Sequence, residues 1–190
     1  KSSVPVMYPV QDSLLGAYRL THPEVILCKE EAHGLINQIK YPIAGKKNLP
    51  SPVICAENGK ALYRGSQIIS LLFPMGFNLE YKGVKIVNGN LVKGRLNKKT
   101  LGTAPGGVVQ SIFQDYGHDM CHKFVADLQR VANRYILFSG FSVGIADCVI
   151  SNFGHEKVLE SVTRAFTHSD AIRSAMENST TDPEAVESAI

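Results

Sequence analysis

The sequence lacks the cysteine pairs and long apolar runs that would assign it to several common protein classes. Its four cysteines, Cys28, Cys55, Cys121 and Cys148, are far apart, and no two form a Cys-x-x-Cys pair, which argues against a zinc ribbon. No apolar run approaches the ~20 residues needed to cross a bilayer, so we expect no association with a membrane. Scattered thiols fit a reducing compartment, and we therefore expect an intracellular protein.

The sequence also lacks a strong excess of charge. It has 20 Lys and Arg against 17 Asp and Glu, a formal net charge of +3. A free-standing DNA-binding domain is usually more basic and gathers its cations on one face. Any contact with phosphate must therefore come from a local cluster. With 44% hydrophobic residues, the 190-residue chain is large enough to bury a core.

Hydrophobic periodicity predicts a mixed fold that is rich in helix. A repeat of about 3.6 residues predicts helices over 11–20, 29–39, 66–72, 107–116, 119–136 and from 155 onward. Between 77 and 96 the pattern alternates, and Asn88-Gly89 is a strong hairpin signal. We expect strands at 77–81, 84–88 and 90–96. The order predicts an α+β fold, helix-rich with a small antiparallel β-ribbon.

Lys98 and Lys99, with Arg95 nearby, are the candidates for contact with nucleotide or RNA. They follow the predicted hairpin, where strand alternation would turn residues 98 and 99 to opposite faces. An ammonium group suits a passing triphosphate because it attracts the phosphates without fixing their geometry. The plain alternative is a solvated end of a hairpin.

Three other groups have a structural and a functional interpretation. Asp12, beside Gln11, can complement the dipole of the helix over 11–20. The glycine-rich loop over 102–107 could cradle a phosphate, but it has no P-loop lysine, and we favour a plain turn. His118 and His122 share a helical face with Cys121 between them, which suggests a small metalloenzyme as an alternative. No strong third ligand lies nearby, and we predict no metal site.

Three separated segments together resemble one protein family. They contain Gln-Asp at 11–12, Asn-Lys-Lys-Thr at 97–100, and Gln-Arg-Val-Ala-Asn at 129–133 followed by Gly-Phe-Ser-x-Gly at 140–144. In order and spacing these are similar to the largest subunit of multi-subunit DNA-directed RNA polymerases, in the branch shared by eukaryotes, archaea and large DNA viruses. The likeness covers about residues 5 to 150, most of the chain.

This resemblance implies a place in the enzyme. Residues 1–150 would form the pore domain, and 151–190 would begin the funnel helices. Nucleotides are thought to enter through the pore, and the 3′ end of backtracked RNA to be extruded into it. Lys98, Lys99 and Arg95 would then contact nucleotide or RNA, and Gln11 and Asp12 would lie near the active centre or be structural. The implied partners are the second-largest and smaller subunits, template DNA, RNA, nucleoside triphosphates and a transcript-cleavage factor.

The catalytic metal site of that family is missing. Nucleotidyl transfer needs Mg²⁺ held by clustered aspartates, and the sequence has no Asp-x-Asp-x-Asp run. We therefore expect no catalytic residue here, Mg²⁺ bound outside this segment, and an internal piece of a longer polypeptide. The alternative is a non-catalytic, polymerase-derived scaffold that binds a protein.

Two departures from the family pattern favour a divergent polymerase, viral or organellar. Ser3-Val4-Pro5 replaces the usual Asn-Lys-Pro, and Ala146 replaces a glycine. The expected location is the nucleus or the cytoplasm, or the host cytoplasm or virion if the polymerase is viral.

Overall fold

The computed structural model describes residues 4–43, 48–55 and 60–178, so that Ser3 lies outside it. The chain divides into two compact units, Lys1–Phe141 and Ser142–Ile190, and each is described by itself. The helices of the first unit are α1 (Gln11–Leu20), α2 (Lys29–Ile36), α3 (Gly65–Ser70), α4 (Lys98–Leu101) and α5 (Val108–Ser139). Its strands are β1 (Ile26–Leu27), β2 (Ile54–Cys55), β3 (Ala61–Arg64), β4 (Leu79–Tyr81), β5 (Val84–Val87) and β6 (Asn90–Lys93). The predicted α+β fold is confirmed.

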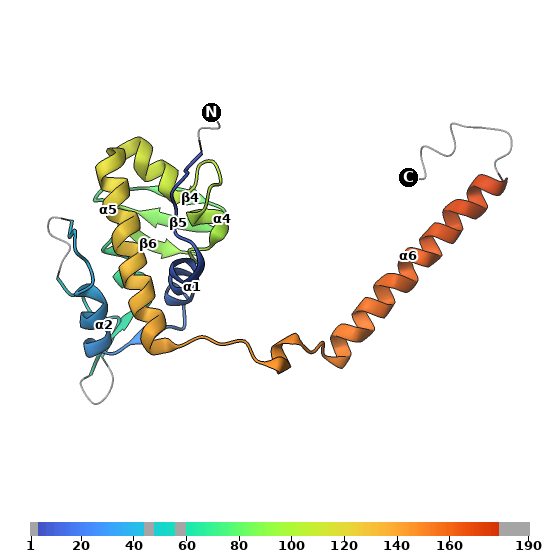
Figure 1. The fold of residues 1–190 in the computed structure, drawn as a ribbon, viewed down its shortest axis with the longest axis horizontal. Coiled ribbons are helices and arrows are strands. Elements are labelled where there is room, and N and C mark those ends of the chain that lie inside the picture. The colour runs from blue at the N-terminus through green and yellow to red at the C-terminus, as the bar shows by residue number, and fades with distance from the viewer. Residues whose placement is uncertain (1–3, 44–47, 56–59, 179–190) are drawn as a thin grey trace. The chain divides into compact units, whose positions relative to one another are not determined.

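The core of the first unit is built where α1 packs along α5 (Figure 1). Ala17 and Leu20 of α1 are fully buried, as is Leu128 of α5. The two backbones approach closely at Gly16, where a Cβ atom would lie 2.5 Å from the carbonyl oxygen of Ala132. Only glycine fits between the helices at this point.

The predicted hairpin region forms the antiparallel sheet β4-β5-β6. Asn88 and Gly89 turn the chain between β5 and β6 with φ of 49° and 70°, the backbone of a type I′ hairpin turn. Val84, Ile86 and Leu91 bury one face of the sheet. A second antiparallel sheet, β1-β3-β2, was not predicted from the sequence.

The long helix α5 is interrupted at Gly117. This residue has φ 81° and ψ 177°, so that two helical segments meet there. The sequence predicted two helices over this range, ending and beginning on either side of Gly117. Just before the break, the Tyr116 hydroxyl donates to the carbonyl of Met75 at 3.1 Å, which ties the first segment to the loop before β4.

The second unit consists of a short 3₁₀ helix, η1 (Ile145–Cys148), and the helix α6 (Asn152–Asn178). The Asp147 carboxylate accepts the amide of Gly144 at 2.7 Å and closes the turn of η1. Along α6, Glu160 pairs with Lys157 at 3.0 Å and with Arg164 at 3.1 Å. Within the described ranges, the helices are too short or too polar to span a bilayer.

Candidate functional site

Lys98 and Lys99 lie in the first turn of α4, and the predicted strand alternation is wrong at this point. The reason is Asn97, whose Oδ1 accepts the amides of Lys99 at 2.8 Å and Thr100 at 3.2 Å and so begins a helix. The Asn97 amide in turn donates to the Thr100 hydroxyl at 2.9 Å. Neighbours in a helix are about 100° apart, so the two lysines do not face opposite ways.

Both lysine side chains are available to solvent. Lys98 and Lys99 are exposed, whereas Thr100 and Leu101 behind them are fully buried. No ion pair in the described part of the chain includes either lysine. Two adjacent ammonium groups therefore stand on a well-anchored turn without a carboxylate to neutralise them.

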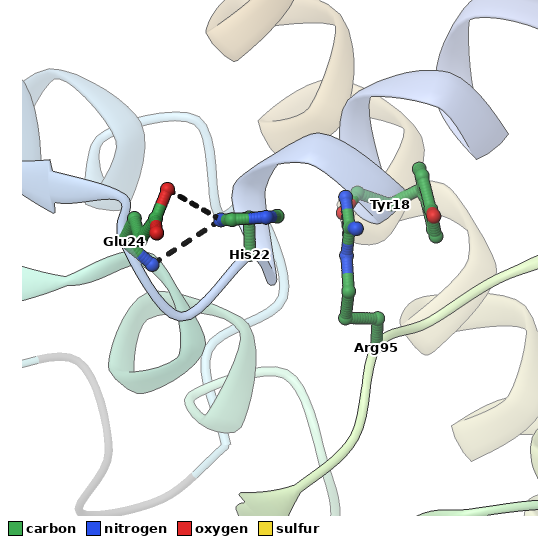
Figure 2. A network of polar contacts seen from close by, with 4 residues as sticks. All are labelled: Tyr18, His22, Glu24 and Arg95. Carbon is green, nitrogen blue, oxygen red and sulfur yellow. Dashed lines mark hydrogen bonds and ion pairs between the residues drawn. The ribbon is translucent and has the colours of Figure 1, made fainter. Parts of the chain in front are cut away.

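Arg95 has a different environment from the two lysines. Its guanidinium carbon lies 3.6 Å from the centroid of the Tyr18 ring, at the end of α1. Its Nε and one terminal nitrogen donate to the Tyr18 carbonyl at 3.4 and 3.2 Å. Figure 2 shows Arg95 beside Tyr18. It also shows the neighbouring His22, whose Nδ1 accepts the Glu24 amide at 3.2 Å. The structure thus directs Arg95 toward the protein.

Gln11 and Asp12 begin α1, and both are exposed. The N-cap is Val10, and neither side chain caps the helix; Asp12 complements the dipole from its first turn. Gln11 has φ 47°, a left-handed conformation that costs a non-glycine residue free energy and is commoner at functional positions. At 1.5 Å per residue, Asp12 and Tyr18 are about 9 Å apart along the helix. Gln11 and Asp12 thus lie at one end of α1 and Arg95 contacts the other end, so that the structure does not bring Arg95 together with Gln11 and Asp12.

The loop over 102–107 is a plain turn, as favoured from the sequence. The Gly107 amide donates to the carbonyl of Ala104 at 3.1 Å. The Gly106 amide donates to the side-chain oxygen of Gln110 at 2.7 Å. Because both amides have partners within the protein, they are not free to bind an anion at the start of α5.

His118, Cys121 and His122 do not form a metal site. His118 is exposed and lies 3.2 Å from Asp119, and the Cys121 thiol points to the Val109 carbonyl at 3.6 Å. Among the described residues, no three His, Cys, Asp or Glu side chains gather closely enough to hold a metal ion. The metalloenzyme alternative therefore has no ligand set in this part of the chain.

These three residues instead contribute to the lining of an apolar cleft of about 760 Å³. The rest of the lining comes from Val4 to Met7 and from other residues of α5, which include Phe113 and Val125. Burial raises the pKa of the Cys121 thiol and so lowers its thiolate fraction.

Two contacts in the structure were not predicted from the sequence. The Arg95–Tyr18 stack joins residues that are 77 positions apart. The Asp127 carboxylate, only 2% exposed, accepts the amides of Lys40 at 3.0 Å and Tyr41 at 2.8 Å. An acidic residue within the apolar stripe of α5 was the signal that could have indicated a buried acceptor.

Comparison with known proteins identifies the family. The model of the family described as "RNA polymerase Rpb1, domain 3" matches residues 1–148. The chain is 30% identical over 189 residues to the DNA-directed RNA polymerase II subunits RPB1-A and RPB1-B of Trypanosoma brucei brucei, and each match covers 94% of this chain and 10% of the relative. It is 26% identical over 194 residues to the probable DNA-directed RNA polymerase II subunit RPB1 homolog of Invertebrate iridescent virus 6, a match covering 94% of this chain and 18% of the relative.

The chain thus spans 10% to 18% of the length of these curated relatives. The matched region contains α1, both sheets, α4, α5 and η1. The relationship predicted from the motifs at 11–12, 97–100 and 140–144 is confirmed: the chain belongs to the RNA polymerase Rpb1 domain 3 family, a part of the polymerase largest subunit.

Proposed function

We propose that this chain lines the pore through which nucleoside triphosphates enter, and backtracked RNA leaves, the active centre of a DNA-directed RNA polymerase. The observation that carries the proposal is the pair of exposed, unneutralised lysines on α4, Lys98 and Lys99. Residues 1–150 would form the pore domain and 151–190 the start of the funnel helices. The proposal also implies an intracellular protein, in the nucleus or cytoplasm of a cell or in a host cell or virion.

The lysines would act by electrostatic attraction. An exposed charge acts over about 8–10 Å at physiological salt, so each ammonium affects only phosphates that pass close to α4. Both side chains are flexible and keep their water, and they would raise the local concentration of polyphosphate without holding it. Such weak binding suits a passage, because a tightly held triphosphate would not move on.

Catalysis in this proposal belongs to the complete enzyme. Mg²⁺ would be bound by aspartates outside these residues, because the sequence has no Asp-x-Asp-x-Asp run and the described part has no cluster that fits a metal. No chemical step is therefore assigned to this chain. The proposed partners are the second-largest and smaller subunits, template DNA, RNA, nucleoside triphosphates and a transcript-cleavage factor.

The test is the double variant Lys98→Ala/Lys99→Ala in the assembled polymerase. We expect the KM for nucleoside triphosphates in elongation to rise on the order of threefold to tenfold at low salt, with little change in kcat. Recovery from backtracking should also slow. Added salt should shrink both effects, because it screens exposed charges.

The matched control is Lys29→Ala/Lys123→Ala, which removes the same charge from exposed positions on α2 and α5. Its KM should stay at the wild-type value. If the α4 variant and this control behave alike at low salt, the lysines have no role in the passage. A polymerase-derived scaffold would then be the better account of the chain.

A further inference from the structure

Arg95 contributes to the candidate site in a different way from the lysines beside it. Its planar face lies on the Tyr18 ring, and two of its nitrogens are bonded to the Tyr18 carbonyl. A guanidinium used in this way has only part of its donors left for a phosphate. No carboxylate in the described residues pairs with it. Its contacts are those of a side chain that holds two segments of backbone together.

The Tyr18 carbonyl is a favourable place for this cation. It belongs to the last turn of α1, where carbonyls lack a donor from the next turn and the helix dipole is negative. The Thr21 hydroxyl also reaches this carbonyl, at 3.3 Å. Arg95 therefore both satisfies an end carbonyl and places a positive charge at the negative end of the helix.

A second contact fixes the same segment. The amide of Leu96 donates to the Thr21 hydroxyl oxygen at 3.1 Å, and the Leu96 side chain is fully buried. Consecutive residues, one through its side chain and one through its backbone, are thus bonded to the last turn of α1. Immediately afterwards Asn97 caps α4. Helix α4 therefore begins within two residues of these contacts.

We infer that Arg95 is a positioning residue, which through its stack on Tyr18 holds Lys98 and Lys99 where they meet passing phosphates. The inference rests on the proposed function of the two lysines. The sequence alone gives all three cations the same role, whereas the structure separates two. The lysines attract phosphate, and the arginine fixes the turn on which they stand.

Substitution by lysine distinguishes positioning from direct contact. Arg95→Lys keeps the positive charge but loses the flat face and the fork that reach the ring and the carbonyl together. If Arg95 contacted phosphate directly, this variant would retain much of its effect. If Arg95 positions α4, Arg95→Lys should behave like Arg95→Ala.

The experiment measures the KM for nucleoside triphosphates and the kcat in elongation by the assembled polymerase. Arg95→Ala and Arg95→Lys should each raise the KM roughly threefold and leave kcat within about 1.5-fold. Tyr18→Leu, which removes the ring and leaves the carbonyl, should shift the KM in the same direction. Tyr18→Phe keeps the ring, and its KM should remain at the wild-type value. Glu24→Gln, a change to an exposed side chain in the next turn, is the control and should have no effect.

The decisive measurement adds Arg95→Ala to the Lys98→Ala/Lys99→Ala background. If Arg95 acts only through the lysines, Arg95→Ala should not change the KM further once both lysines have been replaced. A multiplicative effect there, or a wild-type KM for Arg95→Lys, would overturn the positioning role. If the lysine variant raises the KM but the two Arg95 variants and Tyr18→Leu do not, the positioning role of Arg95 is overturned, while the proposed function stands. If the lysine variant itself has no effect, both the proposed function and this inference are overturned.

Discussion

Removal of the Asp127 carboxylate should destabilise the first unit more than any loss of exposed charge. This side chain is 2% exposed. One oxygen accepts the Lys40 amide at 3.0 Å and an Arg130 nitrogen at 2.8 Å, and the other accepts the Tyr41 amide at 2.8 Å. The carboxylate thereby joins α5 to the segment that follows α2. Its removal would leave two backbone amides and a guanidinium without their acceptor.

The magnitude follows from those contacts. A hydrogen bond to a charged group contributes about 1.5–3 kcal/mol, and truncation of one partner of a buried pair costs about 3–5 kcal/mol. The Arg130 side chain is 38% exposed, so solvent screens its share. We expect Asp127→Ala to lower the free energy of unfolding by about 3 kcal/mol and Arg130→Ala by about 1 kcal/mol. Asp127→Asn should lie between them, because its single oxygen cannot serve both amides.

The assay is urea unfolding of the 190-residue chain followed by circular dichroism, with hydrogen exchange at the Lys40 and Tyr41 amides. Asp115→Ala, an exposed acid on the same helix, is the control and should change stability by less than about 0.5 kcal/mol. If Asp127→Ala costs no more than Arg130→Ala, the carboxylate is not the anchor. Unchanged exchange at the two amides would lead to the same conclusion.

Two glycines and a thiol give further predictions. Gly16→Ala should cost about 2–3 kcal/mol in urea unfolding, because its Cβ would meet the Ala132 backbone at 2.5 Å. Gly34→Ala in α2, with open space around the added Cβ, should instead raise the free energy of unfolding by about 0.5–1 kcal/mol. Equal effects of the two changes would refute the close packing of α1 on α5. Burial raises the pKa of the Cys121 thiol and so lowers its thiolate fraction, and iodoacetamide at pH near 8 should modify it at least about tenfold more slowly than the exposed Cys148. Equal rates would show that Cys121 is open to solvent.

The elements with a local signal could be predicted from the sequence. The helix over 11–20 has the predicted bounds, and the hairpin turn lies at Asn88-Gly89 as predicted. Gly117 falls between two predicted helices and breaks α5. In each case the decisive interaction is between near neighbours: the apolar stripe of one helix, or a pair of residues that tolerate positive φ.

Elements that depend on distant partners could not be predicted. The sheet β1-β3-β2 pairs strands of two to four residues, too short to show a period, and Ile26 pairs with Arg64 across 38 positions. The role of Arg95 likewise depends on α1. The error at α4 is of another kind, because Asn97 followed by Thr100 three residues later is a local capping pattern. The prediction misses this pattern because it extends the preceding strand to residue 96, whereas β6 ends at Lys93.

The break at Gly117 divides the hydrogen-bond ladder of α5 into two parts. The ladder of helical hydrogen bonds does not run through a residue with φ 81° and ψ 177°, so that fraying on one side is not passed directly to the other. Each segment has its own anchors: the one before the break buries Val108 and Ile112, and the one after it contains Asp127 and the close contact with α1. Residues from both sides of the break line the cleft, Phe113 before it and Cys121 and Val125 after it, so that the two walls formed by α5 are not joined by one continuous helical ladder.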